Sequence, residues 1–478
     1  MTMQRTVIRG GFIASQDSQV GDLPVGDILL EGPQIVAVKP HIEVTDAIEF
    51  DARNCILLPG FIDAHRHIWQ GPLRGVCADW SIMDYISRIR LHAARHFTAD
   101  DMYAAQLQGG LEALNAGVTT VTDYCHNLLT PDHAHEAIRG VTQSGLRTVW
   151  NFGLNFPPQP NPYFRSRNER LALLRALAHQ YFTSAQQLVT LGVAPEETLL
   201  VGGFDNLRDQ ILAARELDAR IFWHANTPGP ADAPPRDVGT LHDAGLLGDD
   251  ITFVHMAATA DDEWQLLADH GASVAFTPDT ELQMGMGVPS SEMARRYGVN
   301  QAFGTDIVSN NSADMFTAMR VGLQGIRAHS LDKLGAMPSG VPIRCAEVLK
   351  WGTLDAARAL GLEATIGSIT PGKRADLIML RGDSLTMCGW DRSNVASAIV
   401  LHAQSCDVDT VWVDGQVVKR GGRMQADIQS ASRLMQAASE RLHERINRAG
   451  GFALSDAETA QRLLAVTQHE HGQYAFDA

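Results

Sequence analysis

PGFIDAHRHIWQGPLRG, residues 59–75, places two histidines one residue apart at the end of a run of mainly apolar residues. The run predicts a β-strand, in which residues i and i+2 face the same side, so His65 and His67 point one way and Arg66 the other. Two imidazoles that converge are typical of a metal site. The alternative is a pair of core histidines that are satisfied by ordinary hydrogen bonds.

The chain after Pro59 alternates strand candidates with helical patterns, which predicts repeated βα units. One helix is clearly marked, because Thr98 and Asp101 resemble a capping box and Gly117 supplies a stop. We count eight strands, near residues 60–67, 118–123, 146–154, 188–194, 220–224, 251–255, 272–277 and 301–306. Eight such units predict an α/β fold of the (β/α)₈ TIM-barrel type over residues 59–368.

The two ends of the chain have a different texture from the barrel. Residues 1–58 and 369–425 contain short β-like runs separated by turn residues, and we predict that they form one split β-sandwich domain into which the barrel is inserted. Residues 426–478 are predicted to be a C-terminal helical tail, with an amphipathic helix over residues 427–448.

The composition limits the partners of the chain. Its 478 residues carry 39 Lys and Arg against 55 Asp and Glu, a net charge of −16, which argues against nucleic acid or an anionic membrane as the main partner. Its six cysteines include no C-x-x-C pair, and no stretch of 18 apolar residues or apolar signal core occurs. We expect a cytoplasmic enzyme with a small-molecule substrate, and a homodimer is compatible with the sequence.

Three more metal-competent residues end predicted barrel strands. His224 ends the fifth strand, His255 the sixth and Asp306 the eighth, at the end of the barrel where active sites of this fold are built. Imidazole and carboxylate ligands suit zinc or iron(II), and a catalytic site leaves one position for water. Asp306 is expected to accept the proton of that water, and His255 to polarise the substrate or to act as a further ligand.

The sequence resembles the amidohydrolase superfamily, nearest its subgroup of cytosine-deaminase-like and triazine-hydrolase-like enzymes. The resemblance covers nearly the whole chain and includes LLPGFIDAHRH, ALNAGVTTVTD, FGTD and LDAARALGLEATIGSITPGKRADLIML. It implies a metal-dependent hydrolase in which His65, His67, His224 and Asp306 hold one metal and His255 assists. Two-metal members of the superfamily carry a carboxylated lysine after the fourth strand, where this chain has LVTLGVAPEETLL, so we expect one divalent ion, zinc first and iron(II) second.

One position departs from the resemblance. Deaminases of this subgroup usually carry a glutamate three residues after the fifth-strand histidine, to protonate a ring nitrogen, whereas this chain has Thr227 there. Glu281, in the loop after the seventh strand, is our first candidate for a relocated proton donor. Glu196, after the fourth strand, is the second, and each is alternatively a solvated loop charge.

Several residues in the predicted loops are candidates for substrate binding. Trp69 and Phe156 could stack on a planar ligand, although aromatic residues in such loops often only pack the loop. The other candidates are Gln70, Asp123, His126 and Glu196. Arg66 is expected to form a structural ion pair between the strand and the helix layer.

The sequence therefore predicts hydrolysis of a non-peptide C–N bond, as in deamination of a small N-heterocycle, by hydroxide formed on the metal. An amide, urea or carbamate hydrolase is the alternative, because an acyl carbon needs no ring-nitrogen protonation. A metal-binding barrel without activity is a remote third.

Overall fold

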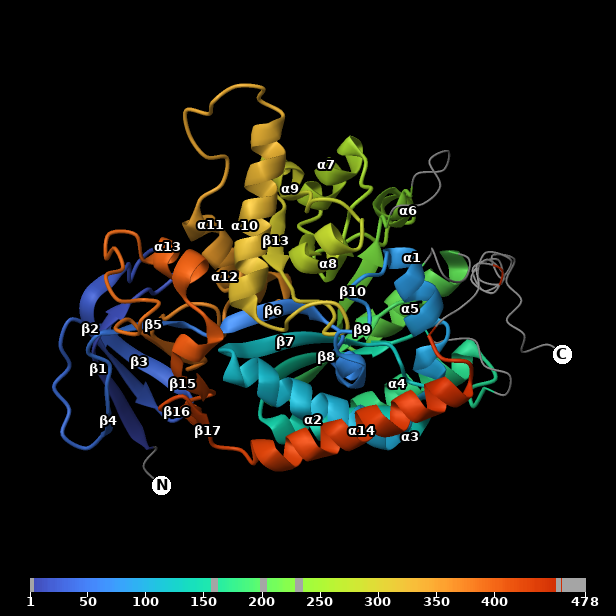
Figure 1. The fold of residues 1–478 in the computed structure, drawn as a ribbon, viewed down its shortest axis with the longest axis horizontal. Coiled ribbons are helices and arrows are strands. Elements are labelled where there is room, and N and C mark those ends of the chain that lie inside the picture. Colours follow the sequence, from blue (N-terminus) through green and yellow to red (C-terminus); the bar gives the residue numbers. More distant parts are fainter. Residues whose placement is uncertain (1–3, 156–161, 198–203, 228–234, 453–456, 458–478) are drawn as a thin grey trace.

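A closed barrel of parallel strands lies at the centre of the molecule in the computed structural model, which describes residues 4–155, 162–197, 204–227, 235–452 and 457 (Figure 1). The eight strands pair in chain order. They are β6 (Phe61–Arg66), β7 (Val118–Cys125), β8 (Arg147–Gly153), β9 (Val189–Ala194), β10 (Arg220–Ala225), β11 (Ile251–His255), β12 (Ser273–Phe276) and β13 (Asn300–Phe303). The predicted (β/α)₈ barrel and all eight of its predicted strands are confirmed.

Helices follow the barrel strands, and most of them cover the outside of the barrel. They are α2 (Ala99–Asn115), α3 (Pro131–Ser144), α4 (Arg167–Tyr181), α5 (Phe204–Glu216), α6 (Asp237–Asp243), α7 (Asp261–Asp269), α8 (Pro278–Gln283), α9 (Ser291–Tyr297), α10 (Met315–Asp332), α11 (Cys345–Trp351) and α12 (Leu354–Ala359). Thr98 and Asp101 form the predicted capping box of α2. The long loop between β6 and α2 contains four short helical turns: η1 (Ile68–Leu73), α1 (Ile82–Tyr85), η2 (Ile86–Arg90) and η3 (Ala93–His96).

The barrel interior is filled by side chains from every strand. One hydrophobic cluster contains buried residues of all eight strands, from Ile62 and Tyr124 round to Ala302, together with residues of α12. Helix α12 lies at the amino ends of the strands, where the Thr252 hydroxyl donates to the Ala359 carbonyl at 2.6 Å. This end is therefore packed shut, and the carboxyl ends are left for the functional groups.

The strands before and after the barrel form one mixed sheet, seen at the left of Figure 1. Its order is β17-β16-β15-β14-β5-β1-β2-β3, and β4 pairs with β1. Its strands are β1 (Arg5–Ile13), β2 (Leu23–Glu31), β3 (Gln34–Lys39), β4 (Ile48–Asp51), β5 (Cys55–Pro59), β14 (Leu377–Arg381), β15 (Val408–Val413), β16 (Gln416–Arg420) and β17 (Arg423–Met424). The antiparallel pairing of β5 with β14 joins the two ends of the chain as predicted, whereas the exact domain boundaries stay predictions.

Three short turns, α13 (Val395–Ser397), η4 (Ala398–His402) and η5 (Ser405–Asp407), precede β15, and the long helix α14 (Ile428–Arg448) follows the sheet. Helix α14 confirms the predicted amphipathic helix and runs along α2 (Figure 1). It also supports the loop after β6, since the Ser439 hydroxyl donates to the Pro72 carbonyl at 2.8 Å.

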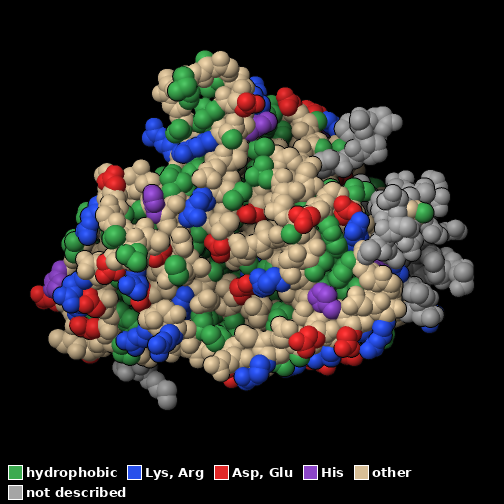
Figure 2. Space-filling view, viewed as in Figure 1, with side chains coloured by type: hydrophobic (Ala, Val, Ile, Leu, Met, Phe, Trp, Pro, Cys, Tyr) green, Lys and Arg blue, Asp and Glu red, His purple; other side chains and the backbone are tan. Residues whose placement is uncertain are grey.

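The face of the molecule in Figure 2 mixes basic and acidic side chains, which lie close together over α14. The loop after α10 stands out at the top of the view and exposes Leu334, Met337 and Val341. In the described part of the chain, no helix has the length and apolar character that a membrane crossing would require.

Candidate active site

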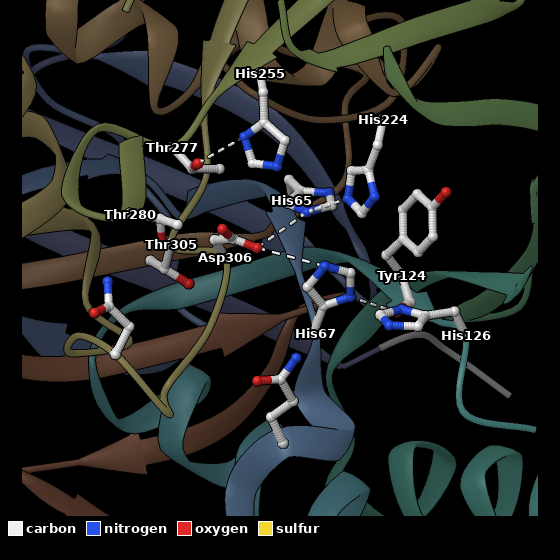
Figure 3. Close-up of polar contacts among 12 residues, drawn as sticks. His65, His67, Tyr124, His126, His224, His255, Thr277, Thr280, Thr305 and Asp306 are labelled. Carbon is white, nitrogen blue, oxygen red and sulfur yellow. Dashed lines mark hydrogen bonds and ion pairs between the residues drawn. The ribbon is translucent and has the colours of Figure 1, made fainter. Parts of the chain in front are cut away.

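Four predicted metal ligands meet at the carboxyl end of the barrel (Figure 3). Nε2 of His65 lies 3.1 Å from Nε2 of His224 and 3.2 Å from Oδ1 of Asp306. Nε2 of His67 lies 3.4 Å from the same carboxylate oxygen. All four side chains are buried, and their role as metal ligands stays a prediction.

The backbone of the same residues closes the barrel. The amide of His67 donates to the Asp306 carbonyl at 2.8 Å, and the amide of Asp306 donates to the His65 carbonyl at 2.9 Å. Gly304 is needed for this approach, because a Cβ there would lie 2.6 Å from backbone atoms of His65. Asp306 and His255 adopt positive φ angles of 62° and 72°, a strained backbone that is concentrated at functional sites.

Hydrogen bonds of Nδ1 fix the orientation and the tautomer of His67 and His224. Nδ1 of His67 lies 2.8 Å from the Tyr124 carbonyl, which can only accept, so Nδ1 carries the proton. Nδ1 of His224 lies 2.7 Å from Oε1 of Glu197, to which it donates in the same way. Burial lowers the pKa of both histidines well below the ordinary value, so both rings are neutral and each presents an Nε2 lone pair.

These lone pairs and the Asp306 carboxylate would repel one another without a cation between them. Burial raises the pKa of Asp306, but the contact with His65 and the nearby imidazoles outweigh it, and the pKa lies below its ordinary value. A tetrahedral ion with ligands at about 2.1 Å separates those ligands by about 3.4 Å, close to the observed 3.1–3.4 Å. The donor set therefore fits a divalent metal such as zinc.

His255, at the end of β11, lies beside the cluster, and its Nδ1 contacts Glu281 and Thr277. Its Nδ1 lies 3.3 Å from Oε1 of Glu281 and 3.1 Å from the Thr277 hydroxyl, and the Thr277 amide donates to the same glutamate oxygen at 2.8 Å. Burial lowers the pKa of His255, but the hydrogen bond to Glu281 and the charge of Asp306 outweigh it and raise the pKa. Glu281 was predicted to lie in a loop, but it belongs to helix α8 and is buried beside His255.

Glu197 and Arg90 belong to the site although we did not select them from the sequence. Oε1 of Glu197 accepts from His224, and both terminal nitrogens of Arg90 lie 3.2 Å from the same oxygen. Glu197 follows β9, one residue beyond the selected Glu196, and Arg90 ends the π-helical turn η2. No periodic pattern marks either residue. The one available signal was the pair of adjacent carboxylates after the fourth strand.

A cavity opens over the metal ligands. Thr227, which replaces the glutamate usual in the deaminases that the sequence resembles, lies on its wall. The other residues that line it are His67, Ile82, Tyr85, Ile86, Arg90, Glu197, His224, His255, Thr280, Met286, Asp306 and Ile307.

Two of the predicted substrate contacts have internal partners instead of lining this cavity. Gln70 donates to the Tyr85 hydroxyl at 2.6 Å and accepts from Ser309 at 2.6 Å. Asp123 accepts from Gln106 of α2 at 2.7 Å. Strand β7 continues to Cys125, so alternation turns Asp123 outward to the helix layer, and burial raises its pKa to about 7.

The remaining candidates are placed as follows. Trp69 is fully buried and packs edge-on against His126, whose ring lies 4.5 Å from that of His67. Glu196 pairs with Arg167 at 3.1 Å. Phe156 lies outside the described residues.

The structural role predicted for Arg66 is confirmed. Its guanidinium is 1% exposed and donates to Glu112 of α2 at 2.8 Å, between the strand and the helix layer.

Comparisons with known proteins agree with the fold and the site. A sequence profile of the Amidohydrolase family matches residues 56–418. The chain belongs to this family. It is 30% identical to a 5-methylthioadenosine/S-adenosylhomocysteine deaminase of Nitratidesulfovibrio vulgaris, over 88% of this chain and 90% of that protein. It is 26% identical to a 5'-deoxyadenosine deaminase of Methanosarcina mazei, over 93% of this chain and 100% of that protein.

Solved structures of low sequence identity share the fold of this amidohydrolase. An adenosine deaminase of Xanthomonas campestris with bound zinc has a TM-score of 0.79 at 23% identity, with 92% of this chain and 98% of that chain covered. An atrazine chlorohydrolase of Arthrobacter aurescens, complexed with zinc and atraton, has a TM-score of 0.80 at 21% identity, with 91% and 100% covered. The family and its relatives make this chain a metal-dependent hydrolase of carbon–nitrogen bonds other than peptide bonds.

Proposed function

We propose that this amidohydrolase is a single-zinc deaminase of small, amino-substituted nitrogen heterocycles. The observation that carries the proposal is the cluster of three imidazole Nε2 atoms and the Asp306 carboxylate at the barrel mouth. The curated relatives named above are deaminases of adenosine-type compounds, which supports the same chemistry here.

His65, His67, His224 and Asp306 would hold the ion. Its second-choice identity is iron(II), since imidazole and carboxylate ligands suit both metals. A single ion is supported by the segment after β9, which offers no lysine that could bridge a second one. When bound, the metal lowers the pKa of a coordinated water to about 7 and so supplies the nucleophile.

The chain's own residues move the protons. The carboxylate of Asp306, whose Oδ1 lies beside Nε2 of His65 and of His67, accepts a proton from the attacking water. Nδ1 of His255 is held by Glu281 and Thr277, which leaves its Nε2 for the substrate. We propose that Glu281 assists the proton transfer by holding Nδ1 of His255. Nε2 of His255 then protonates the departing amine. A C–O bond to the ring carbon forms first, the bond from that carbon to the exocyclic amino nitrogen then breaks, and ammonia leaves.

A second candidate function is hydrolysis of an amide, urea or carbamate. Thr227 on the cavity wall favours it, because a threonine cannot protonate a ring nitrogen as a carboxylic acid would. A homodimer, a cytoplasmic location and the lack of a nucleic-acid partner stay predictions.

The class of substrate that is turned over separates the two functions. Zinc-loaded protein is incubated with a panel of aminopurines and aminopyrimidines, and in parallel with simple amides, ureas and carbamates. Deamination predicts ammonia and an oxo product from at least one heterocycle, with oxygen from solvent water. Turnover of the acyl compounds alone would overturn the proposal in favour of the second candidate.

A further inference from the structure

Arg90 is a buried cation in the substrate cavity. It is 7% exposed and lines the same cavity as His224 and Asp306. A guanidinium keeps its charge under all ordinary conditions, and a buried charge is costly unless anionic or strongly accepting groups surround it.

Glu197 is the partner that the described residues give Arg90, and their contact is loose. Both terminal nitrogens of Arg90 lie 3.2 Å from Oε1 of Glu197, and one of them, Nη1, lies 3.5 Å from Oε2. Charge-assisted N–H···O bonds are usually about 2.7–2.9 Å long. The same oxygen also accepts from His224 at 2.7 Å, so one acceptor is shared among three donors.

The buried ion pair between Arg147 and Asp376 has a different geometry from that of Arg90 and Glu197. Arg147 binds both oxygens of Asp376, at 2.6 and 3.0 Å, as a parallel fork. That guanidinium is satisfied by its carboxylate. Arg90 makes no such fork, and N–H groups on both of its terminal nitrogens remain for another acceptor.

The position of Arg90 determines which part of a ligand it would meet. Its Nη2 atom lies 3.2 Å from Oε1 of Glu197. The same oxygen lies 2.7 Å from Nδ1 of His224. The guanidinium is therefore one carboxylate away from a predicted metal ligand, at the end of the cavity where the reacting ring would lie.

The other walls of the cavity favour a flat ring. Ile82, Ile86, Met286 and Ile307 contribute apolar surface to the lining, and two threonine hydroxyls add neutral polar groups. Apolar side walls beside a fixed guanidinium favour a planar ligand that has one electron-rich edge.

We propose that Arg90 recognises the substrate, and that the heterocycle hydrolysed by this protein carries a ring oxo group whose oxygen accepts N–H bonds from Arg90. This assignment rests on the proposed deamination and narrows it to amino-oxo heterocycles. Glu197 orients Arg90 for this contact while it orients His224.

Matched substrate pairs test the assignment. Cytosine and 4-aminopyrimidine, isoguanine and adenine, and guanine and 2-aminopurine each differ by one ring oxo group. We expect at least one pair in which kcat/KM of the oxo member is higher by about 10- to 150-fold, because a hydrogen bond to a charged group contributes about 1.5–3 kcal/mol.

The variant Arg90→Met should reduce that preference by at least about 10-fold, and Arg90→Lys, which keeps the charge but loses the fork, should reduce it by less. Arg88→Met is the matched control from the same turn, since Arg88 pairs with Asp84 and lies outside the cavity lining. Zinc content, measured on every variant, verifies that the site is intact.

The outcomes separate the two proposals. A preference that Arg90→Met removes and Arg88→Met keeps supports the role of Arg90. If both members of every productive pair react alike, or Arg90→Met slows both equally, deamination stands and the Arg90 assignment is overturned. If no member of any pair releases ammonia, the Arg90 assignment is overturned, and if no heterocycle of the wider panel does so either, the proposed deamination fails with it.

Discussion

Replacing Glu197 with glutamine should weaken metal binding without touching any metal ligand. Oε1 of Glu197 accepts the Nδ1 proton of His224 at 2.7 Å, which fixes the tautomer that turns Nε2 inward. A glutamine keeps the shape but loses the charge, and its amide nitrogen can compete for the same position. It also leaves Arg90 without its carboxylate.

The hydrogen bond sets the size of the effect. Hydrogen bonds to charged groups contribute about 1.5–3 kcal/mol, which corresponds to about a 10- to 150-fold increase in the dissociation constant of the metal. Loss of an outer partner of a ligating histidine commonly costs about 10–100-fold in metal affinity, which agrees.

Zinc affinity is measured by competition with a chromophoric chelator. Glu196→Gln is the matched control, because this adjacent carboxylate pairs with Arg167 and not with His224. We expect Glu196→Gln to bind zinc as the unmodified protein does. Equal affinities for Glu197→Gln and the unmodified protein would refute the argument that Glu197 orients His224.

Three further substitutions test other parts of the account. Asp306→Asn should lower kcat by about 10²–10⁴-fold, since an amide cannot accept the proton of the attacking water; activity within a few-fold of the unmodified protein would remove Asp306 from that role. Glu281→Gln should lower kcat strongly for an amine leaving group and much less for one that needs no proton, with zinc content unchanged; equal losses on both substrates would show general damage to the pocket. Glu112→Ala should cost about 3 kcal/mol of stability in urea unfolding, because it leaves the buried Arg66 unpaired. Glu216→Ala, which breaks an exposed pair, should cost about 0–1 kcal/mol, and similar losses in the two variants would contradict the structural role of the buried pair.

The parts of the fold that repeat were predictable from the sequence. The strands alternate with amphipathic helices, and capping residues such as Thr98 mark where a helix begins. The ligand set could be predicted for the same reason, because the end of a barrel strand has a known place in the fold. His224, His255 and Asp306 each lie at such an end or just beyond it.

The loops could not be predicted, because no period relates their sequence to a direction in space. Glu196 and Glu197 are adjacent, yet one faces Arg167 and the other faces the metal ligands. Even within a strand, a small error in length matters. The sequence predicted that β7 ends at Asp123, which would place this residue at the open end of the barrel. The strand in fact continues to Cys125, and Tyr124 stacks on the ring of His224.

Titration of metal-free protein with zinc, with ammonia release measured at each point, tests the central claim most directly. The account predicts that the deaminase activity rises in proportion to zinc and levels off at one equivalent per chain, with one ammonia formed for each oxo product. Activity that requires two equivalents, or a fully zinc-loaded protein that releases no ammonia from any aminoheterocycle, would contradict it.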